Sequence, residues 1–123
     1  MTKRNPMIDL VNRVEQEEGL PTGVLSALAG IESSFNPNAV SPTGVKGILQ
    51  VTLATGKQYG LNSDADRLAP EKSARAGARY FKDLTKQYKG DMGMAAAHYN
   101  GGGREAQLYK MGRLTDMREE TRN

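Results

Sequence analysis

The chain has 123 residues, of which 37% are hydrophobic and 25% charged, and its formal net charge is +3. Its mean hydropathy of -0.61 is that of a globular protein, and its length fits one domain with one modest core. It has no cysteine, which excludes disulfides, thiolate metal sites and a cysteine nucleophile. Basic residues alternate with acidic ones instead of clustering, so the charge gives little support to nucleic-acid binding.

The N-terminal segment is predicted to form a helix. Asn5 and Pro6 suit the N-cap and the first helical position, and Gly19 suits the end of the helix. The start of the chain is basic but has no continuous apolar run, so we predict no secretory signal and, along the whole chain, no membrane span. One face of the helix is apolar, formed by Met7, Leu10, Val11 and Val14.

The next predicted helix opens at residues 21–22 and carries a carboxylate on its apolar face. Leu25, Leu28 and Phe35 recur at helical spacing on this face. Glu32 lies four residues after Leu28 and therefore falls on the same face. A carboxylate is thus expected where a core residue would normally stand.

Two physical effects predict a raised pKa for Glu32. Burial disfavours its ionised form, and the helix must end within residues 33–37, where unpaired carbonyls present the negative end of the macrodipole. Cleavage of a glycosidic bond needs such an acid, because the leaving oxygen must receive a proton as the bond breaks. The alternative is a glutamate at a helix end that simply points into water.

The remainder of the chain is predicted to be mainly α, with at most a short β-hairpin. The loop at residues 36–47 is rich in turn-forming residues, and Val40 and Val45 could pair within it. A second loop is expected at residues 61–69, and the glycine run at 101–103 should end a helix. Helices are expected over residues 48–59, with Thr52 as a cap, 70–88, 91–99, with Asp91 as a cap, and 104–111.

The helix over residues 70–88 has two distinct faces. Its apolar stripe, which we expect to face the core, consists of Ala74, Gly77, Phe81, Leu84 and Tyr88. Its basic residues are interpreted as a solvated face in preference to a binding site, and they are Arg75, Arg79, Lys82 and Lys86.

Three motifs follow one another along the chain. The first is E-S-S-F at residues 32–35, followed by Ala39, Ser41, Gly44, Gly47 and Gln50. The second is LAPEKSARAGARYF at residues 68–81, and the third is A-H-Y-N-G-G at residues 97–102. Together they closely resemble the signature of the soluble lytic transglycosylase family, which shares the goose-type lysozyme fold. The resemblance covers almost the whole chain.

The resemblance implies one catalytic domain over residues 1–123 that acts on a peptidoglycan glycan strand without a cofactor or metal. The bond cleaved is the β-1,4 bond between N-acetylmuramic acid and N-acetylglucosamine. Glu32 takes the role of the sole catalytic carboxylate, acting first as an acid and then as a base. The muramyl N-acetyl group assists, and attack by the C6 hydroxyl of the same sugar gives a 1,6-anhydro product.

Further roles follow from motif position. Ser41 and Gln50 are expected to line the cleft and to hydrogen-bond the saccharide, and Tyr99 is expected to orient the carboxyl of Glu32. The alternative for Tyr99 is ordinary core packing. Asn100 is placed with these substrate-binding residues, although its expected role is to tie the helix end to its neighbours. His98 is interpreted as incidental, because the motif is permissive at that position and no set of metal ligands accompanies it.

The chain also departs from the family pattern. The family usually has G-L-M-Q followed by an apolar pair and proline, whereas residues 47–53 read G-I-L-Q-V-T-L. This changes the expected cleft wall and leaves the subsite preference open. The closing residues 119–123 resemble the start of the family's E-T-R-N-Y-V segment, but they stop before its aromatic residue and the helix that normally follows. The expectation is therefore either a compact variant or a domain truncated before a final helix.

A more specific resemblance is to the N-terminal transglycosylase domain of large bacteriophage virion proteins. It rests on Met1, the lack of an export signal, the abrupt end and the segment DADRLAPE at residues 64–71. It predicts a monomer or a domain of a larger virion protein, delivered by the particle to the periplasm and cell wall. Three alternatives remain: a hydrolytic muramidase of the same fold, an inactive cell-wall-binding module, and a helical nucleic-acid binder supported by the pI alone.

Overall fold

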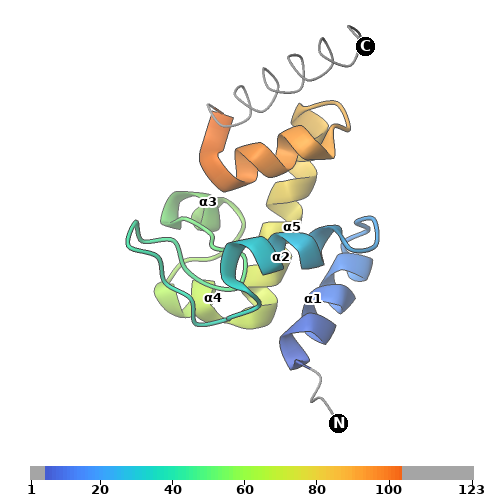
Figure 1. The fold of residues 1–123 in the computed structure, drawn as a ribbon. Helices are drawn as coiled ribbons and strands as arrows, with labels where there is room; N and C mark the ends of the chain where they lie inside the picture. The colour runs from blue at the N-terminus through green and yellow to red at the C-terminus, as the bar shows by residue number, and fades with distance from the viewer. Residues whose placement is uncertain (1–4, 104–123) are drawn as a thin grey trace, which may run out of the picture. The chain divides into compact units, whose positions relative to one another are not determined.

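A computed structural model describes residues 5–103 of the chain. These residues form mostly helices, and their β pairing consists of isolated bridges from Lys46 to Val40 and to Val51 (Figure 1). The mainly α fold class is therefore confirmed. The predicted partner of Val40 was Val45, and the structure pairs it with Lys46 instead. The helices are α1 (Pro6–Glu17), α2 (Val24–Ser33), α3 (Leu53–Gln58), α4 (Asp64–Leu68) and α5 (Pro70–Gln87), followed by a helical segment at 92–103.

The chain divides into two compact units between Tyr80 and Phe81, and each is described by itself. The described part of the first unit holds α1 to α4 and the first half of α5. The described part of the second unit holds the rest of α5 and the helical segment at 92–103. Within residues 5–103, no helix combines the length and the apolar character that crossing a membrane requires.

Helix α1 begins and ends as the sequence predicts. The Asn5 side chain accepts a hydrogen bond from the Met7 N–H at 2.9 Å, and Pro6 occupies the first helical position. Helix α1 packs against α2. The core of the first unit is formed by Val11, Val14, Leu25, Leu28, Ala29, Ile48, Leu49, Val51, Leu61, Ala74, Ala76 and Ala78.

Helix α2 begins at Val24, later than the predicted start at residues 21–22. Gly23 is its N-cap, with a φ of 92°, and has no side chain to cap the helix. The cap comes from α1 instead: the carboxylate of Glu15 accepts hydrogen bonds from the N–H groups of Gly23 at 2.7 Å and Leu25 at 2.9 Å. Glu15 is 2% exposed, so two N–H groups at the start of α2 are satisfied by a buried side chain from another helix.

The region between α2 and α5 differs from the prediction in two ways. The helix expected over residues 48–59 starts only at Leu53, where Thr52 caps it by accepting a hydrogen bond from the Thr55 N–H. Before it, Gln50 has a φ of 50° and Val51 pairs with Lys46, which is incompatible with a helix. The expected loop at residues 61–69 contains α4, whose cap is Ser63.

The second unit is built from two helical pieces. Buried side chains from the end of α5, Phe81 and Leu84, share this unit with buried Met94 and Ala95. The predicted cap is confirmed, since Asp91 accepts a hydrogen bond from the Met94 N–H at 3.1 Å. The helix was expected to end at the glycine run, but it continues through residue 103. The helix predicted over residues 104–111 lies outside the described residues.

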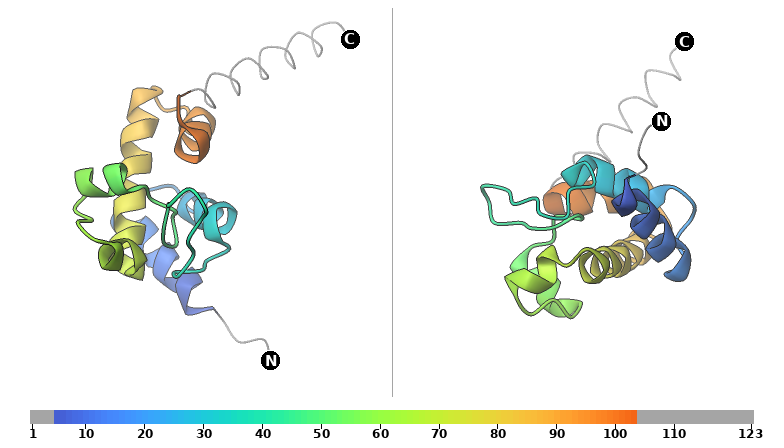
Figure 2. Two further views of the ribbon diagram at one scale, coloured as in Figure 1. Left: turned by 90° about the vertical axis from the view of Figure 1, so that its left-hand side faces the viewer. Right: turned by 90° about the horizontal axis from the view of Figure 1, so that it is seen from below.

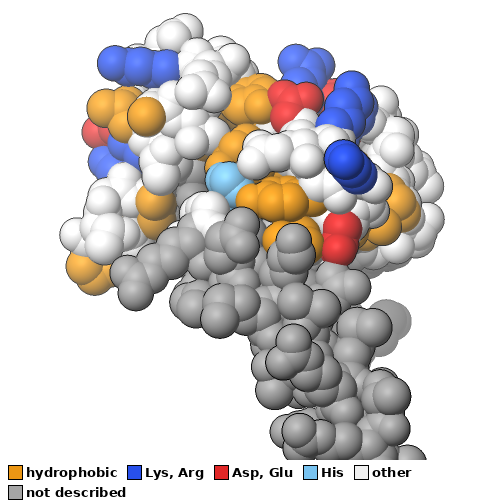
Figure 3. Space-filling model, turned by 90° about the horizontal axis from the view of Figure 1, so that it is seen from above, with side chains coloured by type: hydrophobic (Ala, Val, Ile, Leu, Met, Phe, Trp, Pro, Cys, Tyr) orange, Lys and Arg blue, Asp and Glu red, His pale blue; other side chains and the backbone are white. Residues whose placement is uncertain are grey.

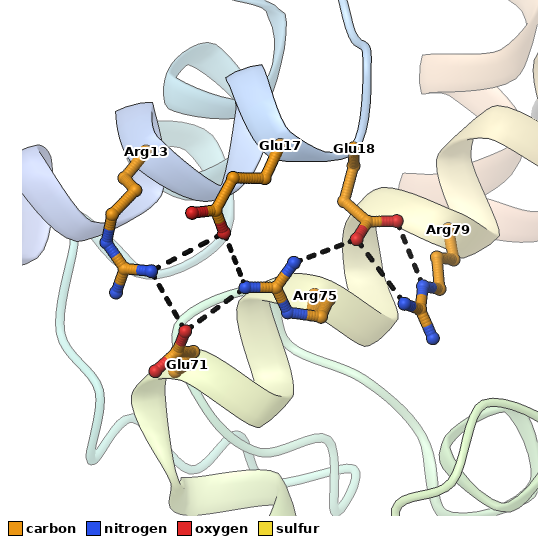
Figure 4. Close-up of polar contacts among 6 residues, drawn as sticks. All are labelled: Arg13, Glu17, Glu18, Glu71, Arg75 and Arg79. Carbon is orange, nitrogen blue, oxygen red and sulfur yellow. Dashed lines mark hydrogen bonds and ion pairs between the residues drawn. The ribbon is translucent and has the colours of Figure 1, made fainter.

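Charged side chains join α1 to α5 in the first unit (Figure 4). Arg75 is the centre of this network: its guanidinium lies 2.7 Å from Glu17, 2.9 Å from Glu18 and 3.1 Å from Glu71. Hydrogen bonds from arginines hold the pKa of all three carboxyls below its usual range. The largest contribution comes from Arg75 for Glu17, from Arg79 for Glu18 and from Arg13 for Glu71. Arg75 and Arg79, which the sequence places on a solvated face, are thus paired with carboxylates from the end of α1, and Arg79 stays exposed. The ionic network consists of Arg13, Glu17, Glu18, Glu71, Arg75 and Arg79.

Candidate active site

Glu32 lies in the last turn of α2, immediately before a sharp change in chain direction. Ser34 and Phe35 both have left-handed backbone conformations, with φ values of 53° and 62°. Their N–H groups bond to the carbonyls of Gly30 and Ala29, which closes the helix as a left-handed C-terminal cap does. Phe35 therefore lies after the end of the helix. The sequence predicts Phe35 on the apolar stripe of this helix, and that prediction is wrong. The Phe35 ring lies against Gly30, where an added Cβ would be 3.6 Å from it.

The carboxyl group of Glu32 is partly withdrawn from solvent. Its Oε1 atom is buried and has no hydrogen-bond partner among the described residues. Burial raises the pKa of Glu32 from the ordinary value of 4.5 to about 7. This is the direction that the sequence predicted, and desolvation is the cause. Glu32 can therefore hold a proton near neutral pH, as a general acid must.

The neighbouring residue, Ser33, ties the end of α2 to the loop that follows. Its hydroxyl donates a hydrogen bond to the Ile48 carbonyl at 2.7 Å and accepts one from the Asn36 N–H at 3.2 Å. Ile48 is fully buried. The segment carrying Glu32 is thus joined to residues 47–51 by a direct bond from the residue next to the carboxylate.

The two saccharide-binding residues predicted in this loop both make bonds within it. The hydroxyl of Ser41 lies 2.9 Å from that of Thr43 and accepts a hydrogen bond from the Val45 N–H. The Gln50 side-chain amide donates to the carbonyls of Ala39 at 3.2 Å and Gly47 at 2.9 Å. These bonds shape the loop, and saccharide contact by either residue stays a prediction.

The loop is also pressed against α4, through a contact that requires glycine. Gly47 has a φ of 90°, and a Cβ added there would lie 2.0 Å from the Arg67 carbonyl oxygen and 2.8 Å from the Ser73 hydroxyl. Any other residue would clash with backbone atoms as well as adopt a strained conformation. The glycine of the first motif is therefore explained by the close approach of two backbone segments.

Arg67 is a residue of this region that the sequence reasoning missed. It is 4% exposed, and its guanidinium donates hydrogen bonds to the carbonyls of Gly44 at 2.9 Å and Val51 at 3.2 Å. Its other terminal nitrogen lies 2.8 Å from Asp64, which also lies 2.9 Å from Lys46. A signal was present in the sequence, because Asp64 and Arg67 have the i, i+3 spacing of neighbours on a helix. Because the sequence analysis predicts a loop at residues 61–69, it does not use this helical spacing.

The remaining predicted site residues lie in the second unit. Tyr99 is half-buried, and its ring packs against Phe81 with centroids 6.5 Å apart, as the alternative of core packing expects. Asn100 is exposed and lies in the helical segment at 92–103. Since Glu32 lies in the first unit, the expected contact between Tyr99 and Glu32 stays a prediction.

His98, the single histidine, pairs with a tyrosine. Its Nδ1 atom lies 2.6 Å from the Tyr88 hydroxyl, and the two rings meet edge to face. Figure 3 shows the imidazole, in pale blue, at the surface of the molecule. Within residues 5–103, no three His, Asp or Glu side chains are grouped so that they could hold a metal ion.

A pocket of about 350 Å³ lies elsewhere in the first unit. It is bounded by Tyr59 and Leu61 after α3 and by charged side chains of α5, including Arg75 and Arg79. Its cations are already paired, Arg75 and Arg79 with carboxylates of the ionic network and Lys72 with Asp66. None of the predicted site residues lines it.

Comparison with known proteins shows the family of the chain. The family model described as "Transglycosylase SLT domain" matches residues 9–117. The chain belongs to this family. The SLT domain is 48% identical over 73 residues to the "Membrane-bound lytic murein transglycosylase F" of Shewanella loihica, a match that covers 59% of this chain and 15% of the relative. It is 43% identical over 74 residues to the protein of the same name from Alcanivorax borkumensis, covering 60% of this chain and 15% of that one.

Solved structures give the same result for the fold. Lytic transglycosylase Slt from Pseudomonas aeruginosa matches with a TM-score of 0.73 and 26% identity, covering 80% of this SLT domain and 17% of that chain. The 70-kDa soluble lytic transglycosylase of Escherichia coli matches with a TM-score of 0.70 and 26% identity, covering 82% of this SLT domain and 18% of that chain. The predicted fold of this family is confirmed. The chain spans less than one fifth of the length of these relatives.

Proposed function

We propose that this SLT domain is a peptidoglycan lytic transglycosylase, in which Glu32 is the catalytic acid and base. The observation that carries the proposal is the half-buried carboxyl of Glu32, with a pKa raised to about 7, at the end of α2. The names of the related proteins support the same reaction class. In this proposal, residues 1–123 act as one catalytic domain.

The reaction uses one carboxyl group twice. Protonated Glu32 donates its proton to the glycosidic oxygen between N-acetylmuramic acid and N-acetylglucosamine, while the bond from that oxygen to the muramyl C1 breaks. The resulting carboxylate then accepts the proton of the muramyl C6 hydroxyl, whose oxygen attacks C1 with help from the N-acetyl group. A 1,6-anhydro sugar forms, no water is consumed, and Glu32 is again protonated.

The test is the mass of the products released from purified peptidoglycan. Transglycosylation leaves the summed mass of the fragments equal to that of the strand, whereas hydrolysis adds one water for each bond cleaved. We expect anhydro products. Products heavier by one water would establish a hydrolytic muramidase, and no release of fragments by a protein that binds peptidoglycan would establish an inactive cell-wall-binding module.

A substitution tests the role of Glu32 itself. Glu32→Gln keeps the shape of the side chain but removes the transferable proton, so we expect turnover to fall by roughly 10³-fold or more, with folding and glycan binding retained. Glu17→Gln is the matched control, since Glu17 is a partly exposed member of the ionic network on α1. Turnover that survives in Glu32→Gln would contradict the assignment.

We also propose that the domain reaches the cell wall as part of a phage particle, where it opens the peptidoglycan locally. The support is the resemblance of the segment at residues 64–71 to virion-protein transglycosylase domains. Mass spectrometry of purified particles should detect peptides of this chain. Their absence from particles, together with their presence in the envelope of uninfected cells, would contradict this route of delivery.

A further inference from the structure

We infer that Arg67 of α4 is a positioning residue that holds the loop at residues 39–51 in the form needed to bind glycan. This inference rests on the proposed function, because it explains how the loop of the proposed glycan-binding site keeps its shape. Arg67 itself is buried beneath the loop, so its expected influence on substrate acts through the loop backbone.

The Arg67 guanidinium bonds to two distant points of the loop. It donates to the carbonyls of Gly44 and Val51, which lie seven positions apart at the two ends of the segment from 44 to 51. These bonds therefore fix both ends of that segment against one rigid planar group. Hydrogen bonds from a charged donor are the stronger kind, and this guanidinium is almost fully withdrawn from solvent.

The loop also contains a backbone conformation that its residue disfavours. Gln50 has a φ of 50°, which is unfavourable for a residue other than glycine, and such strain persists only where surrounding contacts impose it. The neighbouring carbonyl of Val51 is held by Arg67, and the Gly47 backbone rests against the Arg67 carbonyl. Arg67 thus contacts the segment from both its side chain and its main chain.

The loop segment held by Arg67 is bonded to the residue next to Glu32. The Ser33 hydroxyl bonds to the Ile48 carbonyl, which lies inside the segment that Arg67 holds. Figure 2 shows this loop between α2 and the α3–α4 part of the chain. Ser41 and Gln50, the predicted saccharide contacts, lie on the same loop and bond within it.

Arg67 is itself held in place by Asp64. Asp64 accepts from the Arg67 guanidinium at 2.8 Å and pairs with Lys46 of the loop at 2.9 Å. Asp64 is largely exposed, and its pKa is held below its usual range by the hydrogen bonds from Lys46 and Arg67. A substitution of Asp64 therefore leaves the core packing intact, so this residue provides a second, less disruptive test.

The test uses Arg67→Lys and Asp64→Asn, with Arg75→Lys as the matched control. Arg75 also pairs with several carboxylates, but it lies in the ionic network between α1 and α5 and makes no contact with the loop among the bonds described. Glycan affinity is measured with peptidoglycan fragments in the Glu32→Gln background, so that no turnover intervenes. Amide hydrogen exchange of residues 44–51 is measured on the same proteins.

We expect Arg67→Lys to weaken fragment binding by roughly tenfold, the factor for losing about one hydrogen bond to a charged group. Exchange at residues 44–51 should accelerate in Arg67→Lys and, more weakly, in Asp64→Asn, while the amides of α1 keep their rates. In the active protein, KM should rise more than kcat falls. Arg75→Lys should lower the melting temperature without changing fragment binding.

Two results would overturn the inference. Arg67→Lys with unchanged fragment affinity, or with exchange that accelerates equally in α1 and the loop, would make Arg67 a general stabilising residue. If Arg67→Lys does not fold, the same two readouts on Asp64→Asn decide. Failure of the proposed function looks different, because the protein without these substitutions would then release no anhydro products, whatever its affinity for peptidoglycan fragments.

Discussion

At the scale of single residues, Glu32 combines two properties that oppose each other. Burying a carboxyl oxygen without a partner costs free energy, yet that burial keeps the proton available near neutral pH. A fully exposed glutamate would be ionised and unable to protonate a leaving group. Its neighbours carry the strain: Ser34 and Phe35 adopt left-handed conformations directly after it. The end of α2 is thus shaped for the carboxylate at some cost in stability.

This property predicts the pH dependence of the reaction. Glu32 must be protonated when the substrate binds, so kcat/KM should fall as pH rises through about 7. The profile is measured with labelled peptidoglycan, with the stability of the protein checked at each pH. An activity that stays level well above pH 7 would show that another group, or a Glu32 with a different pKa, delivers the proton.

At the scale of elements, the sequence predicted those that carry their own signals and missed those set by distant contacts. Asn5 with Pro6, Thr52 and Asp91 each mark a helix start through a local bond, and all three are confirmed. The start of α2 and the turn at residues 48–51 depend instead on Glu15 of α1 and on Arg67 of α4. Local spacing marks the pair of Asp64 and Arg67 but does not show either of these contacts with a distant part of the chain.

The cap of α2 by Glu15 gives a prediction for this element. Glu15→Gln removes the charge and weakens two buried hydrogen bonds, so we expect a loss of about 1–2 kcal/mol in the free energy of unfolding. Urea unfolding followed by circular dichroism measures it. Gln16→Ala, at the exposed neighbouring position of α1, is the control and should change stability by less than about 0.5 kcal/mol. Equal effects of both substitutions would contradict the capping role.

At the scale of the whole molecule, the carboxyl groups of the first unit make stability depend on pH in two opposite ways. Glu17, Glu18 and Glu71 have lowered pKa values in the fold because arginines donate to them. Their contribution is present above the unfolded value of 4.5 and is lost as pH falls below it. Asp64 and Asp66 act in the same direction from their lower ordinary value of 3.8. Glu32 acts the other way.

For Glu32, the folded pKa of about 7 lies above the unfolded value of 4.5. Between these values the folded chain binds more protons than the unfolded chain, so stability falls as pH rises and then becomes level above about 7. Because the group is only half-buried, we expect this fall to be about 1–2 kcal/mol, less than the full shift would give. These groups together place the greatest stability near the unfolded value of 4.5.

The two sides of this profile can be separated by substitution. In Glu32→Gln the fall between pH 4.5 and about 7 should disappear, while the loss of stability in acid remains. In Arg75→Met the loss in acid should become shallower, because Glu17, Glu18 and Glu71 each lose a donor, while the fall toward pH 7 remains. Urea unfolding at a series of pH values measures both. If both variants keep the complete profile, its origin lies in other groups, and the burial of Glu32 has no energetic consequence for the fold.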